Sequence, residues 1–329
     1  MSLKETLPQS SSITFSRDYI PPFEEHYNSP DSRIFNDISL VKTINVAKFP
    51  VYLISSRVNR MVYALKVFST NVDKYMEFFL NETRFSCLRH PNIIKVVHYE
   101  QDKVSPLDKK SHTKTPYTIM EFAPYGDLFD FIKDYKTKID DKLIRTFFRE
   151  LIDGVEYLHI KGIAHMDLKL ENLLIAEDYN LKITDFDISY IIGDEIIYSK
   201  GTKNYRAPEV SNGTCRDFWA ADMYAIGIIL FILKTRGVFP YLEDKMIMGY
   251  DFRDLIYSQN ELFWKKHGEI IRKKSSYFDK DFKTLFNGLV RLNPKTRFKI
   301  DDVKKSKWYN GSVYSKKDFQ KKCKKMFKC

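Results

Sequence analysis

The spacing of hydrophobic residues changes once along the chain, close to Gly126. Before this point the apolar residues come in short runs typical of strands, at residues 51–54, 62–68, 93–98 and 117–120. One stretch with helical spacing, residues 71–88, interrupts them. After Gly126 the spacing becomes helical and remains so as far as Trp308. The pattern predicts a small, mostly β unit followed by a larger helical unit.

The two ends of the chain lack this regularity. Residues 1–33 mix serine, proline and charged residues without either period, which predicts a disordered leader. We expect one folded body over residues 34–310, with a small lobe at 34–122 and a large lobe at 123–310. Residues 311–329 form a basic tail.

Composition and charge limit the class of protein. The chain has 329 residues, 43% of them hydrophobic, and only 12 glycines and 12 prolines, which excludes collagen-like and wholly disordered chains. The formal net charge of +11 is concentrated near the end, because residues 299–329 contain eleven lysines against three aspartates. The rest of the chain carries only +3, so we expect no specific nucleic-acid partner.

The chain shows no signal for secretion or membrane insertion. Its first residues lack a basic segment leading into an apolar one, and the most apolar run, residues 225–233, is about half the length that spans a bilayer. We interpret this run as a buried helix and expect no transmembrane segment. The four cysteines have neither disulfide-framework nor zinc-ligand spacing. We expect a cytoplasmic protein, with the nucleus as the alternative.

Residues 165–172, His-Met-Asp-Leu-Lys-Leu-Glu-Asn, carry the most informative chemistry. Asp167 can orient a hydroxyl group and accept its proton, and Lys169 can neutralise a transferring phosphoryl group. Asn172 and Asp185 offer the oxygen ligands that Mg²⁺ prefers. The set is the one that phosphoryl transfer requires.

These segments resemble the eukaryotic protein kinase superfamily, whose pattern is H-R-D-L-K-x-x-N, then D-F-G, then A-P-E. The chain has Asp-Phe-Asp at residues 185–187 and Ala-Pro-Glu at residues 207–209, in the same order. The resemblance implies an α+β bilobal protein kinase fold, with a small antiparallel β-sheet lobe containing one main helix and a larger, mainly helical lobe. It also implies ATP as the phosphate donor and Mg²⁺ or Mn²⁺ as the metal.

The resemblance assigns nucleotide-binding roles to residues of both lobes. Lys66, in Val-Tyr-Ala-Leu-Lys, corresponds to the strand lysine that pairs with the α and β phosphates. The other contacts it implies are Val51 and Ala64 above the adenine, Leu174 below it, Met120 behind it, the backbone of Glu121 and Ala123 beside it, and Asp127 at the ribose.

The combination of Lys169, two residues after Asp167, and Thr202 resembles the pattern of the Ser/Thr branch of the superfamily. Glu171 and Asp127 lie where kinases directed to basic residues place acids, and Phe263-Trp264 resembles the calcium/calmodulin-dependent kinase group. The implied function is an ATP-dependent serine/threonine protein kinase that transfers the γ-phosphate of ATP to Ser or Thr hydroxyls of protein substrates.

The chain departs from the family pattern in its glycine-rich loop. This loop should fall at residues 44–51, Ile-Asn-Val-Ala-Lys-Phe-Pro-Val, which contain no glycine. Glycines let backbone N–H groups approach phosphates, and Pro50 removes one such donor. A pseudokinase, a scaffold with weak or no phosphate transfer, is therefore the alternative function.

Three further positions differ. The helix glutamate that pairs with Lys66 normally lies ten residues before the Pro of His-Pro-Asn, where this chain has Asn81. Glu82 is our preferred partner and Glu77 the alternative. Met166 replaces the arginine of H-R-D, and Asp187 replaces the glycine of D-F-G.

The tail combines apolar residues at helical spacing with many lysines. Residues 313–329 could bind calmodulin, lie on an anionic membrane, make an autoinhibitory contact with the kinase, or remain a solvated disordered tail. A third function, a binding module acting through this tail, predicts salt-sensitive binding to acidic partners that truncation after Asn310 abolishes.

Overall fold

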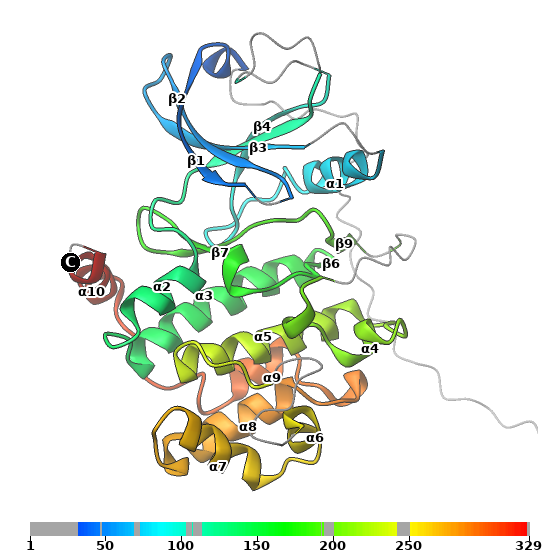
Figure 1. Cartoon of the computed structure of the whole chain (residues 1–329), viewed down its shortest axis with the longest axis vertical. Coiled ribbons are helices and arrows are strands. Elements are labelled where there is room, and N and C mark those ends of the chain that lie inside the picture. The colour runs from blue at the N-terminus through cyan, green and yellow to red at the C-terminus, as the bar shows by residue number, and fades with distance from the viewer. Residues whose placement is uncertain are drawn as a thin grey trace, which may run out of the picture.

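A computed structural model describes residues 32–46, 48–68, 73–102, 107, 114–191, 193, 201–241 and 251–327. The predicted leader, residues 1–33, lies outside the described residues except for its last two, which begin the 3-10 turn η1 (Ser32–Phe35). The described chain forms two lobes, a sheet-containing lobe and a helical lobe, joined by a short connection after β5 (Figure 1).

The small lobe is a five-stranded antiparallel sheet with the order β1-β2-β3-β5-β4. One face is sealed by apolar residues from alternate positions, and Ile54, Leu65 and Ile119 are fully buried there. A single long helix, α1, packs beside the sheet (Figure 1). The bounds are β1 (Ile38–Asn45), β2 (Val51–Ser56), β3 (Val62–Val67), α1 (Asp73–Arg84), β4 (Val96–Glu100) and β5 (Tyr117–Glu121).

The large lobe is mainly helical and carries two small hairpin-like sheets next to the small lobe. Aspartates at 127, 140, 217 and 279 cap the N-termini of α2, α3, α5 and α8 by accepting backbone N–H bonds. The elements are α2 (Leu128–Tyr135), α3 (Asp141–Ile160), β6 (Ile163–Ala164), η2 (Leu170–Asn172), β7 (Leu173–Ile175), β8 (Leu181–Ile183), β9 (Tyr190–Ile191), η3 (Lys203–Tyr205), α4 (Pro208–Ser211), α5 (Phe218–Thr235), α6 (Phe252–Tyr257), α7 (Glu261–Ile270), η4 (Ser275–Tyr277), α8 (Lys280–Leu289), η5 (Pro294–Thr296), α9 (Ile300–Lys305) and α10 (Lys316–Phe327).

Helix α5 is the central helix of the large lobe. It is the one helix in the described part of the chain that is long and apolar enough to cross a membrane, and 94% of it is buried inside the protein. The interpretation of residues 225–233 as a buried helix is therefore confirmed. Arg297, fully buried beside α5, donates to both carboxylate oxygens of Glu209 at 2.5 and 3.0 Å.

The tail folds back onto the large lobe, so its interpretation as a solvated disordered segment is wrong for the described residues. Helix α10 buries Phe319, Cys323 and Met326 against the lobe. Lys322 Nζ lies 2.9 Å from Asp140 Oδ2, and Phe327 packs beside Phe131 of α2, with 5.6 Å between ring centroids. Figure 1 shows α10 beside α2. The apolar face that the spacing predicted for this helix is thus buried against the large lobe itself.

Most element bounds differ slightly from the prediction. The strand expected at residues 93–98 is β4, three residues later, because Ile93 instead forms an isolated bridge with Ile183 of the large lobe. The helix expected at residues 71–88 ends at Arg84, where the chain turns toward the His-Pro-Asn segment.

Candidate active site

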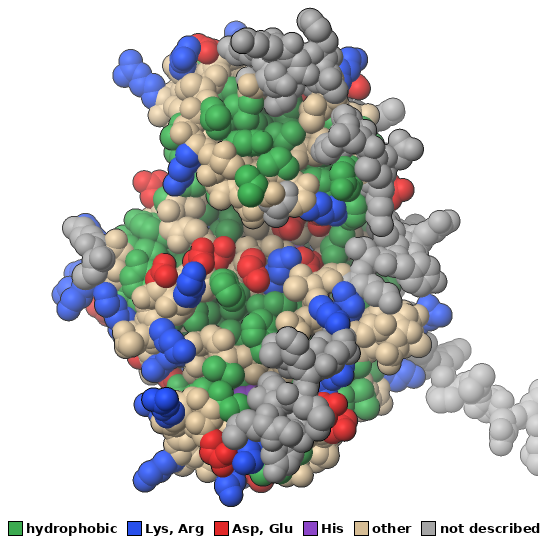
Figure 2. Space-filling model, viewed as in Figure 1, with side chains coloured by type: hydrophobic (Ala, Val, Ile, Leu, Met, Phe, Trp, Pro, Cys, Tyr) green, Lys and Arg blue, Asp and Glu red, His purple; other side chains and the backbone are tan. Residues whose placement is uncertain are grey.

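A cleft of about 610 Å³ separates the two lobes, within the range typical of small-molecule sites. Figure 2 shows acidic side chains gathered with a few basic ones where the lobes meet. All thirteen site residues predicted from the sequence line this cleft. They are Val51, Ala64, Lys66, Glu82, Met120, Glu121, Ala123, Asp127, Asp167, Lys169, Asn172, Leu174 and Asp185.

Lys66 of β3 lies at the inner end of the cleft between two carboxylates. Its Nζ contacts Glu82 of α1 and lies 2.6 Å from Asp185 Oδ1. Burial alone would lower the pKa of Lys66, but Asp185 and Glu82 more than offset it and raise the pKa above its usual value. Glu82, rather than Glu77, is therefore the partner of Lys66 in this structure.

Asn81, which the family spacing places at the glutamate position, has a different role. Its amide nitrogen donates to the carbonyls of Phe186, Asp187 and Ser189 at 3.2, 3.1 and 2.9 Å. These bonds tie α1 to the segment that follows Asp185. The sequence showed that position 81 was unusual but not what it would contact.

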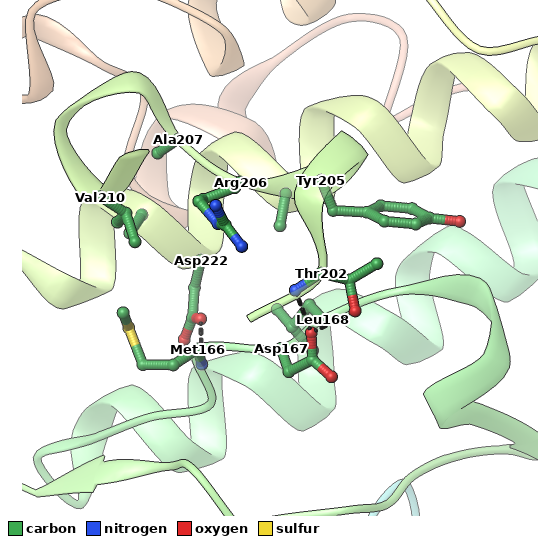
Figure 3. A pocket seen from close by; sticks show the side chains of 11 residues that line it. Met166, Asp167, Leu168, Thr202, Tyr205, Arg206, Ala207, Val210 and Asp222 are labelled. Carbon is green, nitrogen blue, oxygen red and sulfur yellow. Dashed lines mark hydrogen bonds between the residues drawn. The ribbon is translucent and has the colours of Figure 1, made fainter. Parts of the chain in front are cut away.

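Buried polar contacts fix the loop that carries Asp167. Asp222 of α5 accepts from the backbone N–H group of His165 at 2.8 Å. It also accepts from the N–H group of Met166 at 2.9 Å (Figure 3). His165 is fully buried, and its ring lies 5.0 Å from that of Phe186, as expected for a core histidine. Met166 adopts a positive φ of 67°, so the loop backbone is strained at this point.

The Asp167 carboxylate is held by side chains from both sides of the cleft floor. Its Oδ1 accepts from the N–H and the hydroxyl of Thr202, each at 2.7 Å (Figure 3). Its Oδ2 lies 2.6 Å from Lys169 Nζ. Lys169 also donates to Thr202 Oγ1 at 3.0 Å. Burial opposes the charge of Lys169, but Asp167 raises its pKa overall. This arrangement presents a carboxylate and an ammonium group to one point in the cleft.

Gly201 brings Thr202 to this position. A Cβ at residue 201 would lie 2.4 Å from the carbonyl oxygen of Met166, and the residue has a φ of +57°. Both the contact and the backbone conformation favour glycine.

Two oxygen donors suitable for a divalent metal lie next to Asp167. Asn172 donates through its amide nitrogen to the Asp167 carbonyl at 2.9 Å, which leaves its amide oxygen for a ligand. Lys66 keeps the pKa of Asp185 below its usual value despite burial, so this carboxylate is charged. A carboxylate and an amide oxygen fit Mg²⁺ or Mn²⁺. The described residues contain no cluster of three or more His, Cys, Asp or Glu side chains arranged for a metal.

The outer part of the cleft is apolar. Val51 and Ala64 come from adjacent strands, Leu174 from β7 on the opposite lobe, and Met120 is buried at the end of β5. The N–H of Glu121 donates to the Lys95 carbonyl at 3.0 Å, so this backbone segment has a fixed position.

Asp127 occupies the lower edge of the cleft, where it caps α2 through Asp130 N–H at 2.8 Å. Burial, followed by the nearby Asp130 and Glu171 carboxylates, raises the pKa of Asp127.

Sequence reasoning assigned no role to Lys48 or Phe49, which also line the cleft. Lys48 Nζ lies 3.8 Å from Asp187 Oδ2. The only available signal was that both residues fall within the glycine-free loop. Asp187 does not adopt a positive φ, so this conformation does not require the glycine of D-F-G.

Comparisons with known proteins agree with this geometry. A family model described as "Protein kinase domain" matches residues 49–309. CBL-interacting serine/threonine-protein kinase 24 of Arabidopsis thaliana is 34% identical over 225 residues, 68% of this chain and 45% of that protein. CBL-interacting protein kinase 2 of Oryza sativa subsp. japonica is 32% identical over 234 residues, 70% of this chain and 47% of that protein. The chain thus spans about half the length of these curated relatives. With the two-lobed fold and the ordered motifs of the cleft, the match shows that this chain belongs to the protein kinase family.

Proposed function

We propose that this protein is an ATP-dependent serine/threonine protein kinase, which transfers the γ-phosphate of ATP to hydroxyl groups of protein substrates. The observation that carries the proposal is the assembly of Lys66, Glu82, Asp167, Asn172 and Asp185 around one cleft. Together these five side chains supply the base, the phosphate-binding lysine with its partner, and the metal ligands that phosphoryl transfer uses.

Each of these residues has its own role in phosphoryl transfer. Asp167 orients the acceptor hydroxyl and takes its proton, while Lys169, 2.6 Å away, stabilises charge on the transferring phosphoryl group. Lys66, held by Glu82, pairs with the inner phosphates. Asn172 and Asp185 hold Mg²⁺ or Mn²⁺, which supplies charge neutralisation at the phosphate oxygens when bound.

The apolar outer part of the cleft suits the adenine ring. Val51 and Ala64 cover one face, Leu174 covers the other, and Met120 closes the back. The backbone of Glu121 and Ala123 lies at the ring edge. Asp127, which also lines the cleft, would contact the ribose. We propose residues 34–310 as the kinase domain, with residues 34–122 and 123–310 as its two lobes.

We propose that the enzyme prefers substrates with basic residues beside the acceptor. Asp127 and Glu171 both line the cleft and are close enough for Glu171 to raise the pKa of Asp127, after the larger effect of burial. A substrate arginine or lysine would relieve this repulsion. Thr202 beside Lys169 supports an acceptor of the Ser/Thr class.

Phosphate transfer from labelled ATP to matched Ser, Thr and Tyr peptides, with and without flanking arginines, tests the proposal. We expect transfer to the Ser and Thr peptides, lost in Asp167→Asn, and a preference for arginine that Glu171→Gln weakens. ATP binding without transfer to any peptide would instead support the pseudokinase alternative.

We propose that residues 313–329 regulate the kinase by contact with its own large lobe rather than as a preformed calmodulin ligand. The apolar face of α10 is already buried, so calmodulin would have to displace it first. Residues of α10 do not line the cleft, so this docked helix does not block the nucleotide. The similarity to CBL-interacting kinases suggests a regulatory protein partner as well. Tryptic cleavage of the tail with and without calcium-loaded calmodulin separates these cases, because a displaced α10 would be cut faster.

A further inference from the structure

Two departures from the protein kinase pattern, far apart in the sequence, meet in the cleft. The family pattern G-x-G-x-x-G-x-V, counted back from Val51, places Phe49 at the last glycine and Lys48 immediately before it. Asp187 replaces the glycine of D-F-G. In the folded protein Lys48 Nζ lies 3.8 Å from Asp187 Oδ2, although 138 residues separate them in the chain.

Phe49 fixes the loop where the family has a mobile glycine. Its side chain is buried, and its ring centroid lies 4.7 Å from that of Phe68, 5.4 Å from Tyr75 and 5.7 Å from Phe78. The carbonyl of Pro50, next in the chain, accepts from Val67 N–H at 3.0 Å. The backbone here is therefore anchored in the small lobe by an aromatic side chain, and it cannot come close to phosphates as a glycine backbone does.

Lys48 projects from this anchored loop along the same cleft that Lys66 enters from β3. Its ammonium nitrogen lies 3.1 Å from the ring centroid of Phe78 and 4.5 Å from that of Phe49. The nitrogen of Lys66 lies 5.4 Å from the Phe49 centroid, so the ammonium groups of both lysines lie close to the Phe49 ring. Both lysines line the cleft together with Asp185 and Asp187.

When a nucleotide binds near Lys66, its phosphates need a second cation besides this lysine. Lys66 is already shared between Glu82 and Asp185. A triphosphate brings several negative charges to the same place, and the glycine-free loop offers fewer backbone N–H groups to meet them. An ammonium group donates up to three hydrogen bonds and moves on a flexible stem.

We propose that Lys48 binds the phosphates of the nucleotide through its ammonium group, in place of the close backbone contacts that the family's glycines allow, and that Asp187 is the positioning residue that holds Lys48 over the cleft. This inference rests on the proposed function, because it takes ATP as the ligand. It connects the two departures, because Phe49 at the last loop glycine anchors the loop that carries Lys48, and Asp187 at the glycine of D-F-G contacts Lys48.

Calorimetric binding of ATP, ADP, AMP and adenosine to the full chain with Mg²⁺ tests the proposal. Lys48→Met should weaken ATP binding by about tenfold or more, as expected for a charged hydrogen bond. The loss should shrink from ATP to ADP to AMP and should stay below about twofold for adenosine, which also shows that the variant is folded. Lys48→Arg should restore most of the ATP affinity. Lys42→Met, in β1 and exposed outside the cleft, is the matched control and should bind all four ligands normally.

Asp187 is tested through its dependence on Lys48. Asp187→Asn should lower the ATP affinity when it is made in the wild-type background. It should have little effect when it is added to Lys48→Met, because the contact between the two side chains is then already lost. Independent effects of the two substitutions would overturn the positioning role. This coupling is a readout that a merely structural contribution of Asp187 would not produce.

The outcomes separate this proposal from the proposed function. An equal loss for ATP and adenosine, or no loss for ATP, in Lys48→Met would overturn the role of Lys48 while leaving a kinase that still transfers phosphate. Lys48-dependent ATP binding in a wild type that transfers no phosphate would support the role of Lys48 and overturn the kinase function. A wild type that binds no nucleotide would overturn both.

Discussion

The buried pair of Arg297 and Glu209 gives a prediction whose magnitude can be worked from the structure. The Arg297 side chain has no exposed surface, and that of Glu209 is 9% exposed. The guanidinium group donates to both Glu209 oxygens, to the Ala220 carbonyl at 2.7 Å and to the Arg291 carbonyl at 3.0 Å. Arg297→Met would leave a carboxylate buried without its partner, which costs about 3–5 kcal/mol of the free energy of unfolding.

Two further variants separate the effect of the positive charge of Arg297 from the effect of its hydrogen-bonding geometry. Arg297→Lys keeps a positive charge but loses the planar fork, so we expect a smaller loss of about 1–3 kcal/mol. The double variant Glu209→Met with Arg297→Met removes both charges and should be less destabilised than Arg297→Met alone.

Urea unfolding followed by tryptophan fluorescence measures these differences. All three tryptophans, at positions 219, 264 and 308, lie in the large lobe with this pair, so the signal reports its unfolding. A loss below about 1 kcal/mol in Arg297→Met, or a double variant at least as unstable as Arg297→Met, would show that the buried pair does not contribute as described.

Three other expectations follow from single contacts. Gly201→Ala should reduce phosphate transfer by about tenfold or more with little change in ATP affinity. The reason is that the added Cβ would lie 2.4 Å from the Met166 carbonyl oxygen and would displace the loop that carries Asp167. Steady-state kinetics measures the rate, and an unchanged rate would contradict this expectation. Burial lowers the pKa of His267 to about 4, against about 6.5 when unfolded, so its contribution is complete above pH 6.5 and is lost as the pH falls toward 4. Between pH 7 and pH 5 the wild type should lose about 2 kcal/mol more than His267→Gln in urea unfolding, whereas parallel losses would contradict the assignment. Phe327→Ala should cost about 2 kcal/mol of docking free energy and speed hydrogen exchange of α10 more than tenfold, and unchanged exchange would show that this ring does not hold the helix.

The two-lobed fold and the residues of the cleft could be predicted because their signals are contiguous. Asp167, Lys169 and Asn172 stand within six residues, and the period of apolar positions changes from strand-like to helical near Gly126. Such local patterns require no knowledge of which distant segments meet. The role of Lys66 was implied by its resemblance to the strand lysine of the protein kinase family.

Contacts between distant segments could not be predicted in this way. The pairing of Lys48 with Asp187 depends on how two lobes close on each other, which no periodicity encodes. The choice between Glu82 and Glu77 depended on the length of one turn, because a helix rotates about 100° per residue.

The position of the tail in the folded protein also could not be predicted from the sequence. Its apolar spacing showed that α10 has a face to bury, but the rings around Phe327 come from three separate segments, at Tyr125, at Phe131 and Tyr135 of α2, and at Tyr179. An amphipathic pattern indicates that a partner surface exists without indicating which surface it is.

The central claim is that the glycine-free loop still supports phosphate transfer. The most direct measurement determines, on one preparation, both ATP binding and the initial rate of transfer from labelled ATP to a Ser peptide, with Mg²⁺ and with Mn²⁺, for the wild type and Asp167→Asn. We predict that both proteins bind ATP and that only the wild type transfers phosphate, with the rate in Asp167→Asn reduced by about a hundredfold or more. ATP binding by both proteins without transfer by either, with Mg²⁺ and with Mn²⁺, would show instead that the protein is a pseudokinase.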